Sequence, residues 1–73
     1  MSIDEISHIF TQRKYTITHV QHNYAYVTSK RGVTQSTLEK RFADCDELLV
    51  VGFGFDVLAN SHYIWFRERE RNK

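Results

Sequence analysis

The sequence has a single cysteine, Cys45, so it can form no internal disulfide. A chain of this kind suits a reducing compartment. It also lacks long apolar runs, and no segment approaches the roughly 20 consecutive apolar residues that span a bilayer. No N-terminal stretch has the pattern of a signal peptide. We therefore expect a cytoplasmic protein that does not bind a membrane.

Net charge is also nearly absent, with a formal value of +1 at pH 7. The ends of the chain are mildly basic and the centre mildly acidic, which indicates a mixed surface and not a basic stripe. The chain is instead rich in apolar residues, with 41% hydrophobic and 14% aromatic, which argues against disorder. With 73 residues, it is expected to form a single compact domain, residues 1–73, near the lower size limit for independent folding.

Motifs for catalysis and metal binding are missing as well. The four histidines and Cys45 lack the paired spacing of structural zinc sites. His19 and His22 would point to opposite faces of a strand, and Cys45 continues a helical apolar spacing that is typical of a core residue. The glycines at positions 52 and 54 open no helix, so they form no phosphate loop. We expect no enzyme activity, no metal, no cofactor and no small-molecule substrate.

The first half of the chain predicts a helix and a hairpin. Ser2-Ile3-Asp4-Glu5 fits a capping box, and the apolar residues after it have helical spacing, which predicts a helix over about residues 2–12. The composition then changes to Tyr, Thr, Ile and Val, which favour strands. A polar break at residues 21–23 divides this segment into two strands, about 15–21 and 24–30.

The second half repeats this order. Ser36-Thr37-Leu38-Glu39 is a second possible capping box, which predicts a helix over about residues 35–45. The apolar run 48–55 predicts a buried strand, followed by a loop over 56–61 and a last strand from His62 to about Glu68. Residues 70–73 are expected to fray.

The fold that these elements favour is α+β, in the order αββαββ. Its simplest packing is a two-layer arrangement, a four-stranded antiparallel sheet with two helices on one face. The helix–strand–strand halves would be residues 1–31 and 32–70. A shift of 32 positions places Ile6 on Leu38 and Phe10 on Phe42, but few identities survive, so a duplication is only suggested.

Two helices cover about one face of four strands, yet the strands do not alternate apolar and polar residues as a solvated face requires. In the strand over 48–55 we expect the odd-numbered residues from Leu49 to Phe55 to point one way. Leu48 and Val50 would then point away from them, onto the uncovered face.

The uncovered face is also expected to be aromatic. The register favoured for the first hairpin packs residues 17, 25 and 27 inward and leaves Tyr24 and Tyr26 outward. In the last strand Tyr63 and Trp65 share a face with Arg67. Tyr, Trp and Arg are the residue types most enriched at interface hot spots. The alternative is that the aromatics fill an irregular core or lie beneath the 56–61 loop, because the sequence leaves the hairpin register open.

An acidic cluster follows the second helix, where it opposes the helix dipole. Basic groups of a partner would relieve it. The candidate partner-binding residues are therefore Tyr24, Tyr26, Tyr63, Trp65, Arg67, Asp44, Asp46 and Glu47.

These features favour a small non-enzymatic protein-interaction module. We expect a regulator or inhibitor, of the type encoded by phages and mobile elements, that docks on a larger protein or forms a homodimer through its aromatic sheet face. The alternative is a nucleic-acid-binding domain, because sheet aromatics can stack on bases. Its phosphate contacts would come from basic residues at the turn and tail, namely Lys30, Arg31, Arg67, Arg69 and Arg71. The small net charge makes this the weaker hypothesis.

Overall fold

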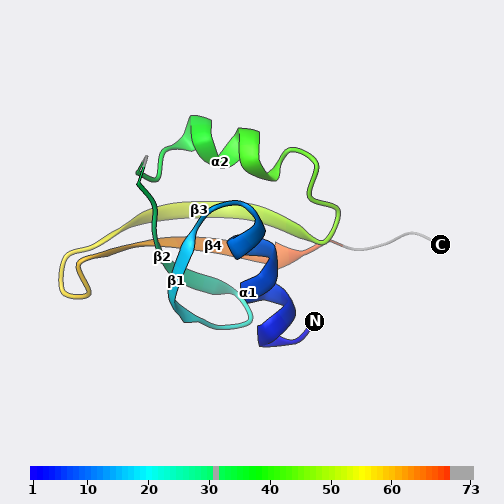
Figure 1. Ribbon diagram of the computed structural model, residues 1–73, viewed down its shortest axis with the longest axis horizontal. Coiled ribbons are helices and arrows are strands. Elements are labelled where there is room, and N and C mark those ends of the chain that lie inside the picture. Colours follow the sequence, from blue (N-terminus) through cyan, green and yellow to red (C-terminus); the bar gives the residue numbers. More distant parts are fainter. Residues whose placement is uncertain (31, 70–73) are drawn as a thin grey trace.

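The computed structural model describes residues 1–30 and 32–69 (Figure 1). Its elements are α1 (Ile3–Gln12), β1 (Thr16–Val20), β2 (Tyr24–Thr28), α2 (Gln35–Phe42), β3 (Leu48–Asp56) and β4 (Ser61–Glu68). The strands form one antiparallel sheet in the order β1-β2-β4-β3. The α+β class and the order αββαββ are those predicted. The tail at 70–73, which we expected to fray, lies outside the described residues.

Hydroxyl groups determine where the two helices begin. The Ser2 hydroxyl accepts a hydrogen bond from the Glu5 N–H at 3.2 Å, and the Glu5 carboxylate accepts one from the Ser2 N–H at 3.3 Å. This confirms the first capping box. The second, predicted at Ser36, is wrong: α2 is capped by Thr34, whose hydroxyl accepts from the Thr37 N–H at 3.2 Å. Thr34 has the extended backbone that an N-cap requires, whereas Ser36 already lies within the helix.

The core is one cluster that draws side chains from both helices and from the sheet. Phe10 of α1 is completely buried, and its ring lies 5.2 Å from the ring of Phe42 in α2 and 5.3 Å from that of Phe66 in β4. Cys45 is buried as predicted, but it lies in the loop after α2, because the helix ends at Phe42 and not at about residue 45.

A β-bulge interrupts the pairing of β3 with β4. Val50 pairs with Phe66, whereas Gly52 pairs with Trp65, so Val51 is an extra residue between the two pairs. A bulge of this kind places two residues of one strand opposite one residue of its partner. The alternation of side chains along β3 therefore changes phase at Val51.

The change of phase overturns our assignment of the faces of β3. Leu48 is completely buried, Val50 packs against the core, and Phe53 pairs with a buried residue of β4. These three side chains and that of Phe55 thus lie on the core face of the sheet. The prediction that Leu48 and Val50 lie on the uncovered face is wrong, because it assumed strict alternation along β3. Gly52 in this run could mark a bulge, but the sequence does not show which side chains the bulge moves to the other face.

The two central strands are paired symmetrically. Tyr24 of β2 lies opposite Trp65 of β4, and Tyr26 lies opposite Tyr63. A two-fold rotation that exchanges β2 and β4 places the Tyr24–Trp65 pair on the Tyr26–Tyr63 pair. The pairing of the two strands therefore has an approximate two-fold axis at its centre. Each edge strand also carries one bulge at a corresponding place. The turn between β3 and β4 extends beyond both helices (Figure 1).

Candidate functional site

Four aromatic side chains lie together on the sheet face opposite the core. They are supplied in pairs by the two central strands, Tyr24 and Tyr26 by β2 and Tyr63 and Trp65 by β4. The residues that alternate with them, Ala25 and Ile64 among others, are completely buried. The hairpin register that we favoured, with both tyrosines of β2 outward, is the one observed. We call these four residues the aromatic face.

The rings of the aromatic face touch one another in series. Their centroids are 5.7 Å apart for Tyr24 and Tyr26, 6.3 Å for Tyr26 and Tyr63, and 5.9 Å for Tyr63 and Trp65. His19 of β1 extends the series, at 5.9 Å from Tyr24 and 6.2 Å from Tyr26. Trp65 remains 56% exposed. The aromatics thus form a contiguous patch, which single scattered residues would not.

His19 was not among the candidate residues. It reaches this face because β1 bulges between Ile17 and His19, which pairs His19 with Tyr26. In β1, which has no glycine, nothing in the local sequence indicates the bulge.

A hydrogen bond fixes one end of the aromatic face. The Tyr26 phenol donates to the Asp56 carboxylate at 2.8 Å, and the same carboxylate accepts from the Ala59 N–H at 3.1 Å. The bond from the phenol lowers the pKa of Asp56 below its ordinary value, and it raises the pKa of Tyr26. Asp56 thereby joins β2 to the turn after β3.

A hollow of about 400 Å³ lies beside Trp65, and Tyr24 and Val51 contribute to its lining. Trp65 pairs with Gly52, and the space that a side chain at residue 52 would occupy is empty. The aromatic face is thus concave at one corner, where the exposed indole forms part of the wall.

The eight candidate residues fall into two groups. Arg67 is exposed and shares the face of Trp65, which lies two positions earlier in β4. The acidic residues Asp44, Asp46 and Glu47 lie elsewhere, in the segment between α2 and β3. They form no single surface with the aromatic face.

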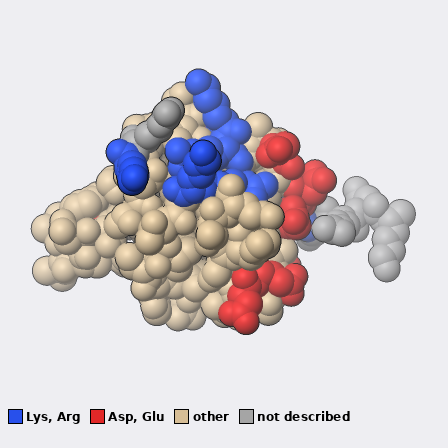
Figure 2. Space-filling model, viewed as in Figure 1, with Lys and Arg blue, Asp and Glu red and all other residues tan. Residues whose placement is uncertain are grey.

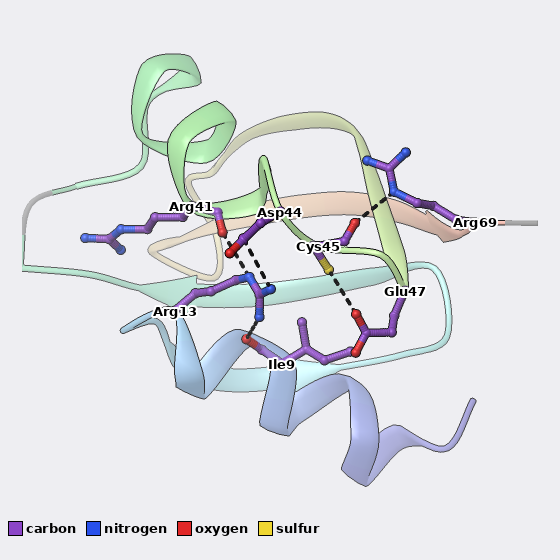
Figure 3. A network of polar contacts seen from close by, with 7 residues as sticks. All are labelled: Ile9, Arg13, Arg41, Asp44, Cys45, Glu47 and Arg69. Carbon is purple, nitrogen blue, oxygen red and sulfur yellow. Dashed lines mark hydrogen bonds and ion pairs between the residues drawn. The ribbon is translucent and has the colours of Figure 1, made fainter. Parts of the chain in front are cut away.

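Arginines of the same chain already satisfy carbonyl groups near the acidic cluster (Figure 3). Arg13 donates through Nε to the Arg41 carbonyl at 2.9 Å and through Nη1 to the Ile9 carbonyl at 3.0 Å. Arg69 donates through Nε to the Cys45 carbonyl at 2.9 Å. The positive charge that the end of α2 requires is therefore supplied from within the chain. The expected need for a partner's basic groups no longer supports a binding site here.

An apolar patch at the β3–β4 hairpin was missed by the sequence analysis. Phe53 and Phe55 lie on the core face but are exposed, since the hairpin extends past the helices. Val57 and Leu58 in the turn are more exposed still, and Leu58 is 100% exposed. We call these four residues the hairpin patch. The pair of apolar residues within a loop between two strands was the signal that could have indicated it.

A basic groove of about 560 Å³ lies at one end of β1 and β2. Lys14, Lys30 and Arg41 line it together with the paired Thr16 and Thr28, and none of the described residues in its lining is acidic. Figure 2 shows basic side chains gathered in one region and acidic side chains in others. Only the fold brings these three cations together, because they come from three separate segments.

No helix within residues 1–30 and 32–69 is both long and apolar enough to cross a membrane. In the same part of the chain, no three histidine, cysteine or acidic side chains are grouped so that they could hold a metal ion. Comparison of the chain with protein-family models, with curated proteins and with solved structures finds no match.

Proposed function

We propose that this protein is a non-enzymatic interaction module that docks on a larger protein through its aromatic face. The contiguous aromatic array on the face opposite the core carries the proposal. Trp65 is still 56% exposed, so a partner can bury apolar surface that the isolated domain leaves in water. A Trp or Tyr side chain buries about 150–250 Å² when it is fully covered.

The rings are held in place before any partner binds. Each ring of the aromatic face packs against its neighbour, and Tyr26 is further fixed by its bond to Asp56. Side chains that are already ordered lose less conformational entropy on binding, which leaves more of the burial energy for affinity.

The hairpin patch adds a second contact surface to the proposed interface, at the end of the same hairpin. The β3–β4 hairpin carries Tyr63 and Trp65 on one face and Phe53 and Phe55 on the other, with Leu58 at its tip. A protruding apolar tip fits a groove on a larger protein. We further propose that the protein acts in the cytoplasm as a regulator or inhibitor, of the type encoded by phages and mobile elements.

The test is affinity capture from host lysate with three matched baits: wild type, Trp65→Ala and Asp44→Ala. A partner that wild type and Asp44→Ala retain, and that Trp65→Ala loses by tenfold or more (about 1.4 kcal/mol), supports the proposal. Equal capture by all three folded baits contradicts it. Sedimentation of wild type and Trp65→Ala at micromolar concentration tests the homodimer that the same face would form.

Binding of single-stranded nucleic acid is the second candidate, favoured by one observation. The basic groove ends at Thr16 and Thr28, which continue the face that carries Tyr24 and Tyr26. Bases could stack on the tyrosines while Lys14 and Lys30 contact phosphates. Arg31 and Arg71, nominated from the sequence, lie outside the described residues. Oligonucleotide binding that weakens steeply with salt, and weakens further in Lys14→Ala/Lys30→Ala, would favour this candidate.

A further inference from the structure

The two edges of the described sheet differ in how they are protected. β1 has 5 residues and carries exposed polar side chains, among them Thr18 at its bulge. β3 has 9 residues and carries no charged side chain before Asp56 and no proline. Short strands, charges, prolines and bulges are the usual means of protecting an edge from pairing with another chain. Of these, β3 has only the bulge at Val51.

A groove of about 360 Å³ runs between this edge and α2. Its β3 wall is formed by five consecutive residues, 49–53, and its α2 wall includes Leu38, Glu39 and Phe42. Successive side chains of a strand point to opposite faces. A groove that touches consecutive residues therefore follows the main-chain edge, where alternate N–H and C=O groups of β3 point away from β4.

We propose that this groove binds one extended segment of a protein partner, which joins the sheet as a further strand beside β3. Only an extended polypeptide presents N–H and C=O groups alternately, at the spacing that an edge strand requires. The groove contains none of the four residues of the aromatic face, so the proposal does not depend on docking through them. Val51 lines both the groove and the hollow beside Trp65.

The walls of the groove define the chemistry of the segment. Leu38, Phe42 and Val50 are apolar and favour apolar side chains at every second position of the segment. Arg69 lies at the end of the groove where β3 begins, because its main-chain N–H donates to the Glu47 carbonyl at 3.0 Å. A segment antiparallel to β3 places its C-terminal end there. The segment therefore has an apolar side chain at every second position, and an Asp, a Glu or a terminal carboxylate at its C-terminal end.

A second copy of this chain fits the groove less well. The space beside β3 is bounded by α2, and a two-fold pairing of β3 with its copy would bring a second α2 to the same side of the joined sheet. A lone strand carries no helix and avoids this conflict.

The experiment is selection of displayed random eight-residue peptides on the full chain, followed by an N-methyl scan of the best peptide. The protein is unaltered in the scan, so no variant has to fold. Methylation at every second residue is expected to weaken binding about tenfold or more, the equivalent of a lost hydrogen bond. Methylation at the intervening residues, whose N–H groups face away from β3, is expected to change binding less than about twofold. Equal effects at all positions overturn the proposal.

Hydrogen exchange locates the peptide. Amides of β3 should gain protection in the complex, while those of β1 should not, and Trp65→Ala should bind the peptide as wild type does. Three outcomes overturn the proposal: no peptide is enriched, the selected peptide loses binding in Trp65→Ala, or β3 is already protected in a dimer without peptide. Because the Trp65→Ala control separates the two surfaces, failure of the groove and failure of the aromatic face can be told apart.

Discussion

The phenol ring of Tyr63 lies across the backbone of Gly54, in the place that a side chain on residue 54 would occupy. The two residues are direct partners in the β3–β4 pairing. A glycine in a strand interior often marks such a close approach. Because residue 54 has no side chain, the ring of Tyr63 can lie over its backbone, between Tyr26 and Trp65. Gly54 thus makes room for the ring at the centre of the aromatic face.

Gly54→Ala is expected to displace Tyr63 and destabilise the protein by about 1–2 kcal/mol, the usual cost of an overpacked site. Trp65 fluorescence should change at the same time, because the indole loses its tyrosine neighbour. Gly52→Ala is the matched control: the space at Gly52 is empty, so this variant should be neutral or about 0.5 kcal/mol more stable. Urea unfolding of both variants measures the difference, and equal stabilities would refute the role of Gly54 in making room for the ring.

Tyr26→Phe is expected to raise the pKa of Asp56 toward its ordinary value of 3.8, because the donated hydrogen bond is removed. In the wild type the lowered pKa contributes stability above pH 3.8, and this contribution is lost as the pH falls through the folded pKa. A carboxyl NMR titration of Asp56 in both proteins measures the shift. An unchanged pKa would mean that the backbone N–H groups of Ala59 and Leu58 hold the carboxylate without the phenol.

The raised pKa of Tyr26 has the opposite pH dependence. The hydrogen bond to Asp56 favours the neutral phenol, so its contribution to stability is complete below pH 10.0 and is lost as the pH rises through the folded pKa. Burial also raises the pKa of Tyr15, so absorbance titration should show two late-ionising tyrosines. Asp56→Asn should shift only Tyr26 to lower pH.

Phe10→Ala is expected to cost about 3–5 kcal/mol, as for a fully buried aromatic residue. Domains have only about 0.05–0.15 kcal/mol of stability per residue, so this variant should be largely unfolded by circular dichroism. Phe10→Leu keeps the variant measurable at a loss of about 1–1.5 kcal/mol. Phe55→Ala, at an exposed ring of the hairpin patch, should cost less than about 1 kcal/mol; a larger loss would assign that ring to the core.

Arg13→Lys is expected to cost about 1–3 kcal/mol, because one ammonium group cannot reproduce both bonds, to the Ile9 and Arg41 carbonyls. Asp44→Ala removes the ion pair with Arg13 instead. That pair is long, at 3.9 Å, and the Asp44 side chain is 90% exposed, so the cost should stay below about 0.5 kcal/mol. Denaturant midpoints of the two variants compare the effects. If Asp44→Ala is the costlier change, the network in Figure 3 acts through charge and not through the carbonyls.

Local patterns in the sequence were sufficient for the elements and their order. The capping box of Ser2 and Glu5, the β-rich hairpin segments and the apolar 48–55 run all involve neighbours in the chain, so they are visible without a fold. The alternation within β2 paired Tyr24 with Tyr26, and the alternation within β4 paired Tyr63 with Trp65. That both pairs share the face opposite the core was only the favoured alternative. The N-cap of α2 was misassigned because Ser36 is followed three residues later by Glu39, as in a capping box, whereas the true cap, Thr34, lacks this pattern.

The sequence by itself thus determined the αββαββ order, because this order depends on periodicity along single segments. It favoured the aromatic face but left the register of the first hairpin open, and the pairing of β2 with β4 decided it. Only the tertiary structure decided the faces of β3, since the bulge at Val51 forms through its pairing with β4. The same holds for the groove beside α2, the hairpin patch and the basic groove. Each of these surfaces depends on where one segment ends relative to another segment that is distant in the sequence. Packing in three dimensions sets these relative positions.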